Sequence, residues 1–278
     1  MKPAAFRYHR PRSLAEALAL LAEHGPQAKL IAGGQSLGPL MNMRLAQPAE
    51  LVDLNSLAGL DFVNENEDAI EIGALATHHA LATSPLVRKS CPLLAEAAQS
   101  IGHYAIRTRG TLGGSLAHAD PAAQLPLVAA TLGAEIVAAG PRGERRIPAA
   151  GFFVSLMSTV LEPDEILVSV RVPKAAPGER HAYLQFSRRR GDFAIVAVAT
   201  TLLMDKKGNA RNLRLGIGGA EDKPVVLTDF ASGEKPDAVA RKAREAVNPA
   251  ETPRVPAVYR RELVEVLARR ALLEAMGK

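Results

Sequence analysis

Two glycine pairs are the residues of this 278-residue chain whose type and spacing best suit chemistry. Gly33 and Gly34 lie in the run LIAGGQSL at residues 30–37, and Gly113 and Gly114 lie in the run RGTLGGSLAHADPAAQLP at residues 109–126. Because glycine has no side chain, such pairs let a ligand approach the backbone closely. Main-chain N–H groups in loops of this kind suit a phosphate. The two runs together indicate a clamp on one large phosphorylated cofactor.

Short elements must position both loops. Residues 13–24 predict a helix, in which Ser13 and Glu16 form a capping box. Residues 28–32 predict a buried strand that leads straight into the first glycine pair, and residues 50–54 predict the next strand. A Gly-Gly pair alone is more often a tight turn, but both pairs have a small hydroxyl residue beside them. That shared feature favours contact with a ligand.

Several other kinds of site do not fit these runs. The first run lacks the G-x-G-x-x-G fingerprint of dinucleotide-binding folds, and the second lacks the G-K-[ST] ending of a nucleotide triphosphatase loop. Arg107 and Arg109 could offset phosphate charge, although loop arginines are more often solvated. His118 and Asp120 are only two candidate metal ligands, so we predict no metal site on this chain and expect Asp120 to cap the turn at Pro121.

Composition narrows the class further. Hydrophobic residues make up 47% and charged residues 23% of the chain, and the net charge of +5 is too diffuse to indicate nucleic-acid binding. Cys91 is the only cysteine, which excludes an internal disulfide and an iron–sulfur cluster ligated by this chain alone. No run is apolar enough for a membrane span or a signal peptide. We therefore expect a cytoplasmic protein.

The strand pattern divides the chain into three units. Residues 1–55 predict a small α/β unit, and residues 56–175 predict a second mixed unit with strands at 69–74, 135–139 and 165–173. Residues 174–179 form the best linker. Residues 176–278 predict a three-stranded antiparallel sheet followed by helices at 236–247 and 258–275. The predicted fold class is α+β.

The two glycine runs together resemble those of a known family. LIAGGQSL followed by RGTLGGSLAHADPAAQLP is similar to the FAD-binding medium subunit of molybdenum hydroxylases, which includes the carbon monoxide dehydrogenase medium subunit and the flavin domain of xanthine dehydrogenase. The segments EPDEILVSVRVP and FSRRRGDFAIVAVA look like the same family. The resemblance implies a two-subdomain FAD-binding fold of the vanillyl-alcohol-oxidase-like type, followed by a C-terminal domain.

The resemblance also implies which residues contact FAD. The expected contacts are a first loop, a second loop, an apolar residue beside the cofactor, a residue near the adenine end and a partner for a ribose hydroxyl. The first loop comprises Leu30, Ile31, Ala32, Gly33, Gly34, Gln35, Ser36 and Leu37, and the second comprises Thr111, Leu112, Gly113, Gly114 and Ser115. The apolar residue beside the cofactor is Ile101, the residue near the adenine end is Leu167, and the partner for a ribose hydroxyl is Gln124. Gln124 departs from the acid often found there, and residues 183–186 lack a lysine that members often carry.

The implied function is electron transfer. By resemblance, a large subunit holds the molybdopterin and hydroxylates the substrate, a small subunit holds two-iron iron–sulfur clusters, and this chain passes electrons through FAD to a quinone, NAD or oxygen. The expected assembly is a dimer of such heterotrimers, without nucleic acid. We expect no acid or base of this chain to act on the organic substrate. Two alternatives remain open, a stand-alone FAD oxidoreductase and a flavin-free binding or assembly module.

Overall fold

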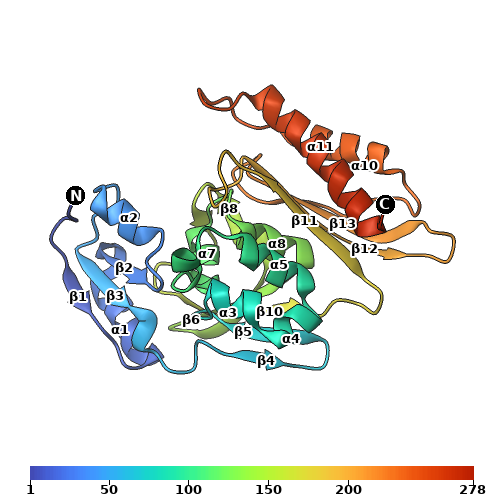
Figure 1. Cartoon of the computed structure of the whole chain (residues 1–278). Helices are drawn as coiled ribbons and strands as arrows, with labels where there is room; N and C mark the ends of the chain where they lie inside the picture. Colours follow the sequence, from blue (N-terminus) through green and yellow to red (C-terminus); the bar gives the residue numbers. More distant parts are fainter.

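Three main β-sheets and one small two-stranded ribbon set out the architecture of the chain (Figure 1). The computed structural model describes all 278 residues. A three-stranded sheet near the N-terminus is followed by a five-stranded sheet, a small two-stranded ribbon and a four-stranded sheet. The mixture of helix and sheet confirms the predicted α+β class.

The N-terminal sheet is parallel and has the strand order β1-β3-β2. Its strands are β1 (Arg7–His9), β2 (Ala28–Ile31) and β3 (Glu50–Asp53). Helix α1 (Leu14–His24) buries Ala17 and Leu21 in the core that also contains Val52. The Ser13 half of the predicted capping box is confirmed, because the Glu16 N–H donates to Ser13 Oγ over 3.2 Å. The Glu16 side chain accepts from the Arg12 N–H over 2.8 Å, not from that of Ser13 as a capping box requires. Sequence analysis missed β1, whose three residues are polar and mostly exposed.

The five-stranded sheet has the order β4-β5-β10-β6-β7. Its central strand β10 pairs antiparallel with both β5 and β6, as expected for a strand buried on both faces. The strands are β4 (Val63–Glu65), β5 (Ala69–Gly73), β6 (Glu135–Gly140), β7 (Gly143–Pro148) and β10 (Ile166–Pro173). The three strands predicted in this part of the chain are therefore confirmed.

Helices pack against the five-stranded sheet and enclose the largest apolar core (Figure 1). They are α3 (His78–Thr83), α4 (Pro85–Ser90), α5 (Pro92–Ser100), α6 (Tyr104–Arg107), α7 (Leu112–His118), α8 (Gln124–Leu132) and α9 (Ala149–Phe152). The ribbon β8 (Phe153–Ser155) and β9 (Ser158–Thr159) follows α9. The remaining short elements nearer the N-terminus are η1 (Gly25–Gln27), α2 (Leu37–Asn42) and η2 (Leu54–Ser56).

The C-terminal sheet has four strands, so the prediction of three was wrong. Its strands are β11 (Arg180–Phe186), β12 (Val196–Met204), β13 (Ala210–Gly218) and β14 (Val225–Leu227). The missed strand β14 has three half-buried residues and pairs only with β13, so its sequence shows too little alternation to be recognised. Helices α10 (Pro236–Glu245) and α11 (Ala257–Met276) pack together, and their buried residues share a core with this sheet.

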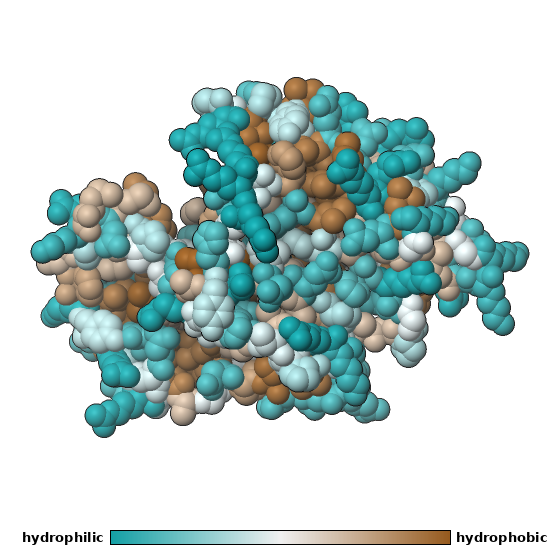
Figure 2. All heavy atoms as spheres, in the orientation of Figure 1, coloured by the Kyte–Doolittle hydropathy of each residue, from teal (hydrophilic) through white to brown (hydrophobic).

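The five-stranded part and the C-terminal sheet meet at helix α8. A Cβ atom at Gly216 of β13 would lie 1.9 Å from Thr131 Oγ1 of α8, so only glycine lets these elements approach so closely. Figure 2 shows that the surface is hollowed between the N-terminal lobe on the left and the C-terminal lobe at the top. None of the helices is both long enough and apolar enough to span a membrane.

Candidate cofactor site

The first glycine segment is a tight turn between β2 and α2. Strand β2 ends at Ile31, and Gly34 adopts a φ of +69°, which side chains rarely allow. Two side-chain amides hold the carbonyl groups of the turn: Asn55 Nδ2 donates to the Ala32 oxygen and Gln35 Nε2 donates to the Gly33 oxygen, each over 2.9 Å. These two side chains therefore fix the turn through its carbonyl groups, and neither of them accepts a hydrogen bond from an N–H group of the turn.

Those N–H groups have no acceptor within the chain. The five consecutive donors belong to Gly33, Gly34, Gln35, Ser36 and Leu37. Each of these residues is half-buried, so the donors are only partly accessible to water. A run of free backbone donors in a turn makes an anion-binding concavity. This segment therefore has the geometry that the sequence predicts for a phosphate site.

The sequence predicts a loop at the second glycine segment. In the structure this segment is the first turn of helix α7. Thr111 caps the helix, since its Oγ1 accepts from the Gly114 N–H over 3.1 Å. The N–H groups of Leu112 and Gly113 donate to the carbonyls of Ala76 and Ala74, each over 2.9 Å. These N–H groups therefore already have acceptors within the chain. The sequence suggested that they bind phosphate, but the segment instead presents a surface of small residues.

The two glycine segments are in direct contact. A Cβ atom at Gly33 would lie 2.0 Å from the carbonyl oxygen of Arg109 and 2.8 Å from Cα of Gly110. A Cβ atom at Gly114 would lie 4.0 Å from that of Ala32, and Gly114 itself is exposed. Segments that lie almost 80 residues apart in sequence therefore form one surface, with free donors on one side and small residues on the other.

His78 holds this surface in place through its contacts with Gly110. It begins α3, after the cap Thr77, and its backbone N–H donates to the Gly110 oxygen over 2.9 Å. Its ring packs on Gly110, where a Cβ atom would lie 2.5 Å from His78 Nε2. Burial, aided by the charge of Arg107, lowers the pKa of His78 to about 4, so the ring is neutral at physiological pH.

The arginines near the second segment have different roles. Arg107 Nη1 donates to the carbonyls of Ile101 and Gly102, over 2.9 and 3.1 Å, so this side chain holds the turn that follows α5. Ile101 is half-buried at that turn. Arg109 is exposed. Both arginines are possible phosphate partners by sequence, but Arg107 is tied to the backbone that carries Ile101.

Gln124 and Leu167 lie in the framework around the site. Gln124 begins α8 and is buried, and its Nε2 donates to Gln185 Oε1 over 3.1 Å. The Tyr183 hydroxyl donates to the same oxygen over 2.8 Å, so this network joins α8 to β11. Leu167 is buried in β10. No hydrogen bond joins either residue to the glycine segments.

Of the two weak metal candidates, His118 is the last residue of α7 and Asp120 caps the turn that follows. The Ala122 N–H donates to Asp120 Oδ1 over 2.9 Å, which confirms that Asp120 caps the turn at Pro121. The residues that sequence analysis missed are supporting ones: Asn55, Ala74 and Ala76 fix the two segments through single hydrogen bonds. Their types and spacing carry no recognisable signal, because each acts on a segment that is distant in sequence.

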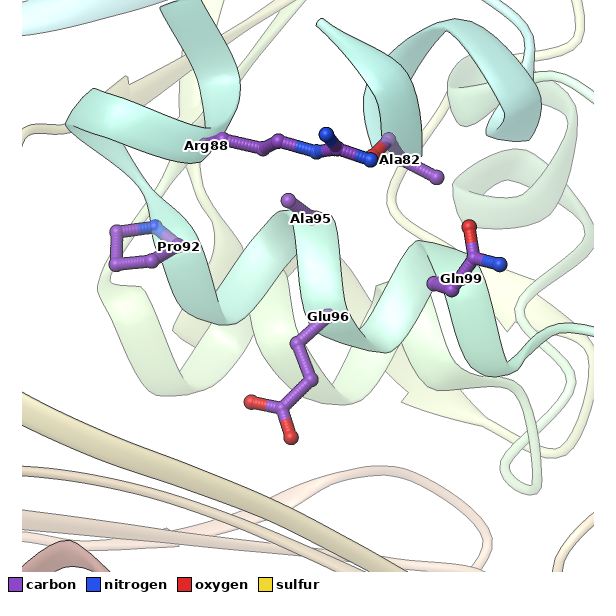
Figure 3. Close-up of a pocket in the computed structure, with 6 residues that line it drawn as sticks. All are labelled: Ala82, Arg88, Pro92, Ala95, Glu96 and Gln99. Carbon is purple, nitrogen blue, oxygen red and sulfur yellow. The ribbon is translucent and has the colours of Figure 1, made fainter. Parts of the chain in front are cut away.

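A separate pocket of about 280 Å³ lies on helices α3, α4 and α5 (Figure 3). Arg88 Nε donates to the Ala82 oxygen over 2.8 Å. Glu96 points away from Arg88 (Figure 3), so the charged groups do not converge on a common point. No residue of either glycine segment lines this pocket. We therefore place the candidate site at the glycine segments.

The fold, together with the families that it matches, defines a class of protein, a flavin-binding subunit of an oxidoreductase. Residues 4–175 match the model of the FAD binding domain in molybdopterin dehydrogenase, and residues 181–275 match that of the CO dehydrogenase flavoprotein C-terminal domain. The chain therefore belongs to the FAD-binding medium subunits of molybdenum hydroxylases, as the resemblance predicts.

Relatives of known function match over the whole chain. The chain is 39% identical to the 6-hydroxypseudooxynicotine dehydrogenase complex subunit alpha of Paenarthrobacter nicotinovorans, covering 100% of this chain and 97% of that protein. It is 37% identical to the carbon monoxide dehydrogenase medium chain of Hydrogenophaga pseudoflava, covering 100% and 99%. The fold is similarly shared: the carbon monoxide dehydrogenase of Hydrogenophaga pseudoflava lacking the Mo-pyranopterin moiety superposes with a TM-score of 0.95 at 36% identity, covering 100% of this chain and 99% of that one.

The residues present fit an FAD cofactor. Its pyrophosphate requires several donors in a concave backbone, and residues 33–37 supply five free N–H groups. Its bulk requires close approach, and the exposed Gly114 lies opposite Ala32 without an intervening side chain. The side chains of Ser36 and Ser115, which make no hydrogen bond within the chain, add two hydroxyl groups.

Proposed function

We propose that this chain is the FAD-carrying electron-transfer subunit of a multi-subunit molybdenum hydroxylase. The observation that carries the proposal is the row of five unpaired N–H groups at residues 33–37, in a segment that contacts the small residues before and at the start of α7. When bound, FAD supplies the ability to take up single electrons and release them in pairs. The family membership supports FAD as the cofactor.

In this proposal each set of residues has a specific task. The N–H groups of Gly33, Gly34, Gln35, Ser36 and Leu37 bind the pyrophosphate. Thr111, Leu112, Gly113, Gly114 and Ser115 form the opposite wall and let the cofactor lie against the backbone. Ile101 and Leu167 supply apolar contacts, the latter toward the adenine end, and Gln124 approaches a ribose hydroxyl. The chain orients the cofactor and shields it from water, and no side chain acts on the organic substrate.

The expected boundaries remain part of the proposal. We propose two FAD-binding subdomains at residues 1–55 and 56–175 in a vanillyl-alcohol-oxidase-like arrangement, followed by a C-terminal domain at 176–278. The sheets support this division, since each main sheet is built from strands of one of these segments. The shared contact between Gly33 and Arg109 supports a site that needs both subdomains.

The proposed partners are a large molybdopterin subunit and a small iron–sulfur subunit, assembled as a dimer of heterotrimers in the cytoplasm. The single cysteine supports this reading, because it is buried and cannot ligate a cluster with other cysteines of this chain. Relatives are named as subunits of dehydrogenase complexes, among them the caffeine dehydrogenase subunit beta of Pseudomonas sp. strain CBB1, 36% identical over 286 residues.

The test is the purified chain, alone and with its partner subunits. We expect a yellow protein with about one FAD per chain, whose flavin is reduced by the organic substrate only when the other subunits are present. A colourless chain that binds no added FAD contradicts the proposal. A yellow chain that oxidises a substrate without partners supports the alternative of a stand-alone oxidoreductase.

A further inference from the structure

Two histidines and a glutamate converge at one end of the N-terminal sheet. His9 is the last residue of β1, His24 is the last residue of α1 and Glu50 is the first residue of β3. One nitrogen of each ring and one carboxylate oxygen all lie within 4.8 Å of one another. His9 Nε2 lies 2.7 Å from Glu50 Oε2, and the centroids of the two rings are 5.2 Å apart. None of these groups belongs to the glycine segments.

The backbone brings these residues together in a way that their spacing hides. Parallel pairing places Arg7 opposite Glu50 and His9 opposite Val52, so the side chains of Arg7, His9 and Glu50 share one face of the sheet. Helix α1 covers this face, and its last residue brings the third ligand. The 14 and 25 residues that lie between successive ligands match no metal motif, which is why the sequence pattern indicates no metal on this chain.

The chemistry of the set suits a transition-metal ion. Two imidazoles and one carboxylate are the three protein ligands of many zinc sites, in which a water completes the tetrahedron. Ligand atoms around tetrahedral zinc lie about 3.3 Å apart, given bond lengths of about 2.0–2.2 Å. The atoms here are 2.7 to at most 4.8 Å apart, so modest side-chain rotation brings them to that spacing.

The surroundings of Glu50 leave one of its oxygens for a metal. The residue is only 1% exposed, and Arg7 Nε donates to Oε1 over 2.8 Å while Oε2 faces His9. An arginine on the far oxygen orients the carboxylate, as supporting residues do in metal sites. Its positive charge opposes a nearby cation, and two features offset that charge: the C-terminal end of α1 at His24, which favours a cation, and the carboxylate of Glu23, 3.8 Å from His24.

We propose that His9, His24 and Glu50 form a binding site for Zn²⁺ or a similar divalent transition-metal ion, with water as the fourth ligand. The ion takes the place of the hydrogen bond between His9 and Glu50 and ties β1, the end of α1 and the start of β3 together. Of these elements, β3 pairs directly with β2, and the first glycine segment lies at the end of β2. A bound ion therefore stabilises the part of the chain that holds the free N–H donors. The proposal is independent of the proposed function, because no ligand belongs to the cofactor site.

The experiment is a zinc titration of the full-length chain by calorimetry, followed by equilibrium dialysis and elemental analysis. We expect one zinc per chain with a Kd in the micromolar range. His9→Gln and His24→Gln should each weaken binding at least tenfold. Arg7→Gln should tighten binding severalfold, because it removes the opposing charge while both histidines remain. Circular dichroism shows whether each variant is folded, and the two histidine variants are independent tests.

The matched control is His181→Gln. His181 Nε2 of β11 lies 3.5 Å from Glu96 of α5, which makes them a histidine–glutamate pair without a second histidine. We expect this variant to bind zinc as the unchanged chain does. Absence of zinc binding below about 0.1 mM overturns the proposal, since the expected Kd lies in the micromolar range. Equal affinity in the unchanged chain, His9→Gln and His24→Gln also overturns it, because the zinc then lies elsewhere.

Discussion

Gly33 and Arg109 lie so close that no other residue fits at position 33: a Cβ atom there would be 2.0 Å from the Arg109 carbonyl oxygen. This is backbone against backbone, which a side-chain rotation cannot relieve. The contact joins the turn with the free N–H donors to the start of the second glycine segment. The first glycine of the pair therefore serves the contact between the two segments, and Gly34 serves the turn through its positive φ.

Gly33→Ala should separate the two segments. We expect a loss of stability of about 1–3 kcal/mol, as for other overpacked sites, together with at least a tenfold weaker hold on FAD. Flavin release during gel filtration and chemical unfolding measure the two effects. The matched control is Gly38→Ala, four residues after Gly34 in α2, where an added Cβ has no neighbour within 4 Å. A Gly33→Ala chain that keeps its flavin as the control does contradicts the geometry of the contact.

The two glycines of the second segment should respond differently to substitution. A Cβ atom at Gly113 would lie 2.6 Å from Cβ of Ala74, whereas Gly114 is exposed and only Thr111 Oγ1, at 2.8 Å, and Ala32 are near. Gly113→Ala should therefore lower stability by roughly 1–3 kcal/mol. Gly114→Val should abolish FAD retention while leaving most of the fold, because the valine side chain would occupy the space opposite Ala32 in which we expect the cofactor to lie.

Flavin content and thermal unfolding of the two variants, measured side by side, separate these effects. Added FAD should raise the melting temperature of the unchanged chain, because it binds the folded state only, and should leave that of Gly114→Val unchanged. A Gly114→Val chain that binds FAD as tightly as the unchanged chain shows that the assignment of this segment is wrong.

The sequence predicts the elements of this fold better than it predicts the roles of single residues. Strong local patterns, such as the cap of Ser13 and the alternation in β10, predict their elements correctly. Weak ones fail: β1 and β14 have three residues each and form only because a neighbouring strand accepts them. Pairing with distant residues leaves no mark on a segment of that length.

The candidate site shows the same division between local and distant causes. The glycine pairs are visible in the sequence, but which of their N–H groups are free depends on Ala74 and Ala76, about 37 residues before Gly113. The cluster of His9, His24 and Glu50 is likewise invisible until parallel pairing places Arg7 opposite Glu50. Pairing between segments that are distant in sequence therefore determines which N–H groups are free and which side chains meet, and residue type alone does not show this.

Cys91 should be inert in the folded chain. It is 1% exposed, its Sγ donates to the Pro173 oxygen over 3.3 Å, and burial raises the pKa of its thiol to about 12. Since only the thiolate reacts, a thiol reagent at pH 8 should modify less than a tenth of the chains in an hour. The same reagent in denaturant should titrate one thiol per chain, which serves as the control. Rapid reaction of the native chain contradicts the burial of Cys91.

The ion pair between Glu165 and Arg145 should make stability depend on acid. Glu165 is 8% exposed, and its carboxylate accepts from Arg145 Nε over 2.7 Å and from the Glu162 N–H over 2.8 Å. The hydrogen bonds from Arg145 lower the pKa of Glu165 below its ordinary value of 4.5. In the folded state this carboxylate therefore binds fewer protons than in the unfolded state, so its contribution is complete above about pH 4.5 and is lost as the pH falls through the folded pKa.

Glu165→Gln should therefore cost roughly 1–3 kcal/mol at pH 7, because it removes a charge-assisted hydrogen bond from a buried position. The loss should shrink as the pH falls below 4.5, where the unchanged chain also becomes protonated. Urea unfolding between pH 7 and pH 3 measures both quantities. The exposed neighbour Glu162→Gln, whose backbone N–H still donates to Glu165, is the matched control and should stay within about 0.5 kcal/mol of the unchanged chain. A difference between the unchanged chain and Glu165→Gln that stays constant across this range shows that the carboxylate does not titrate with folding.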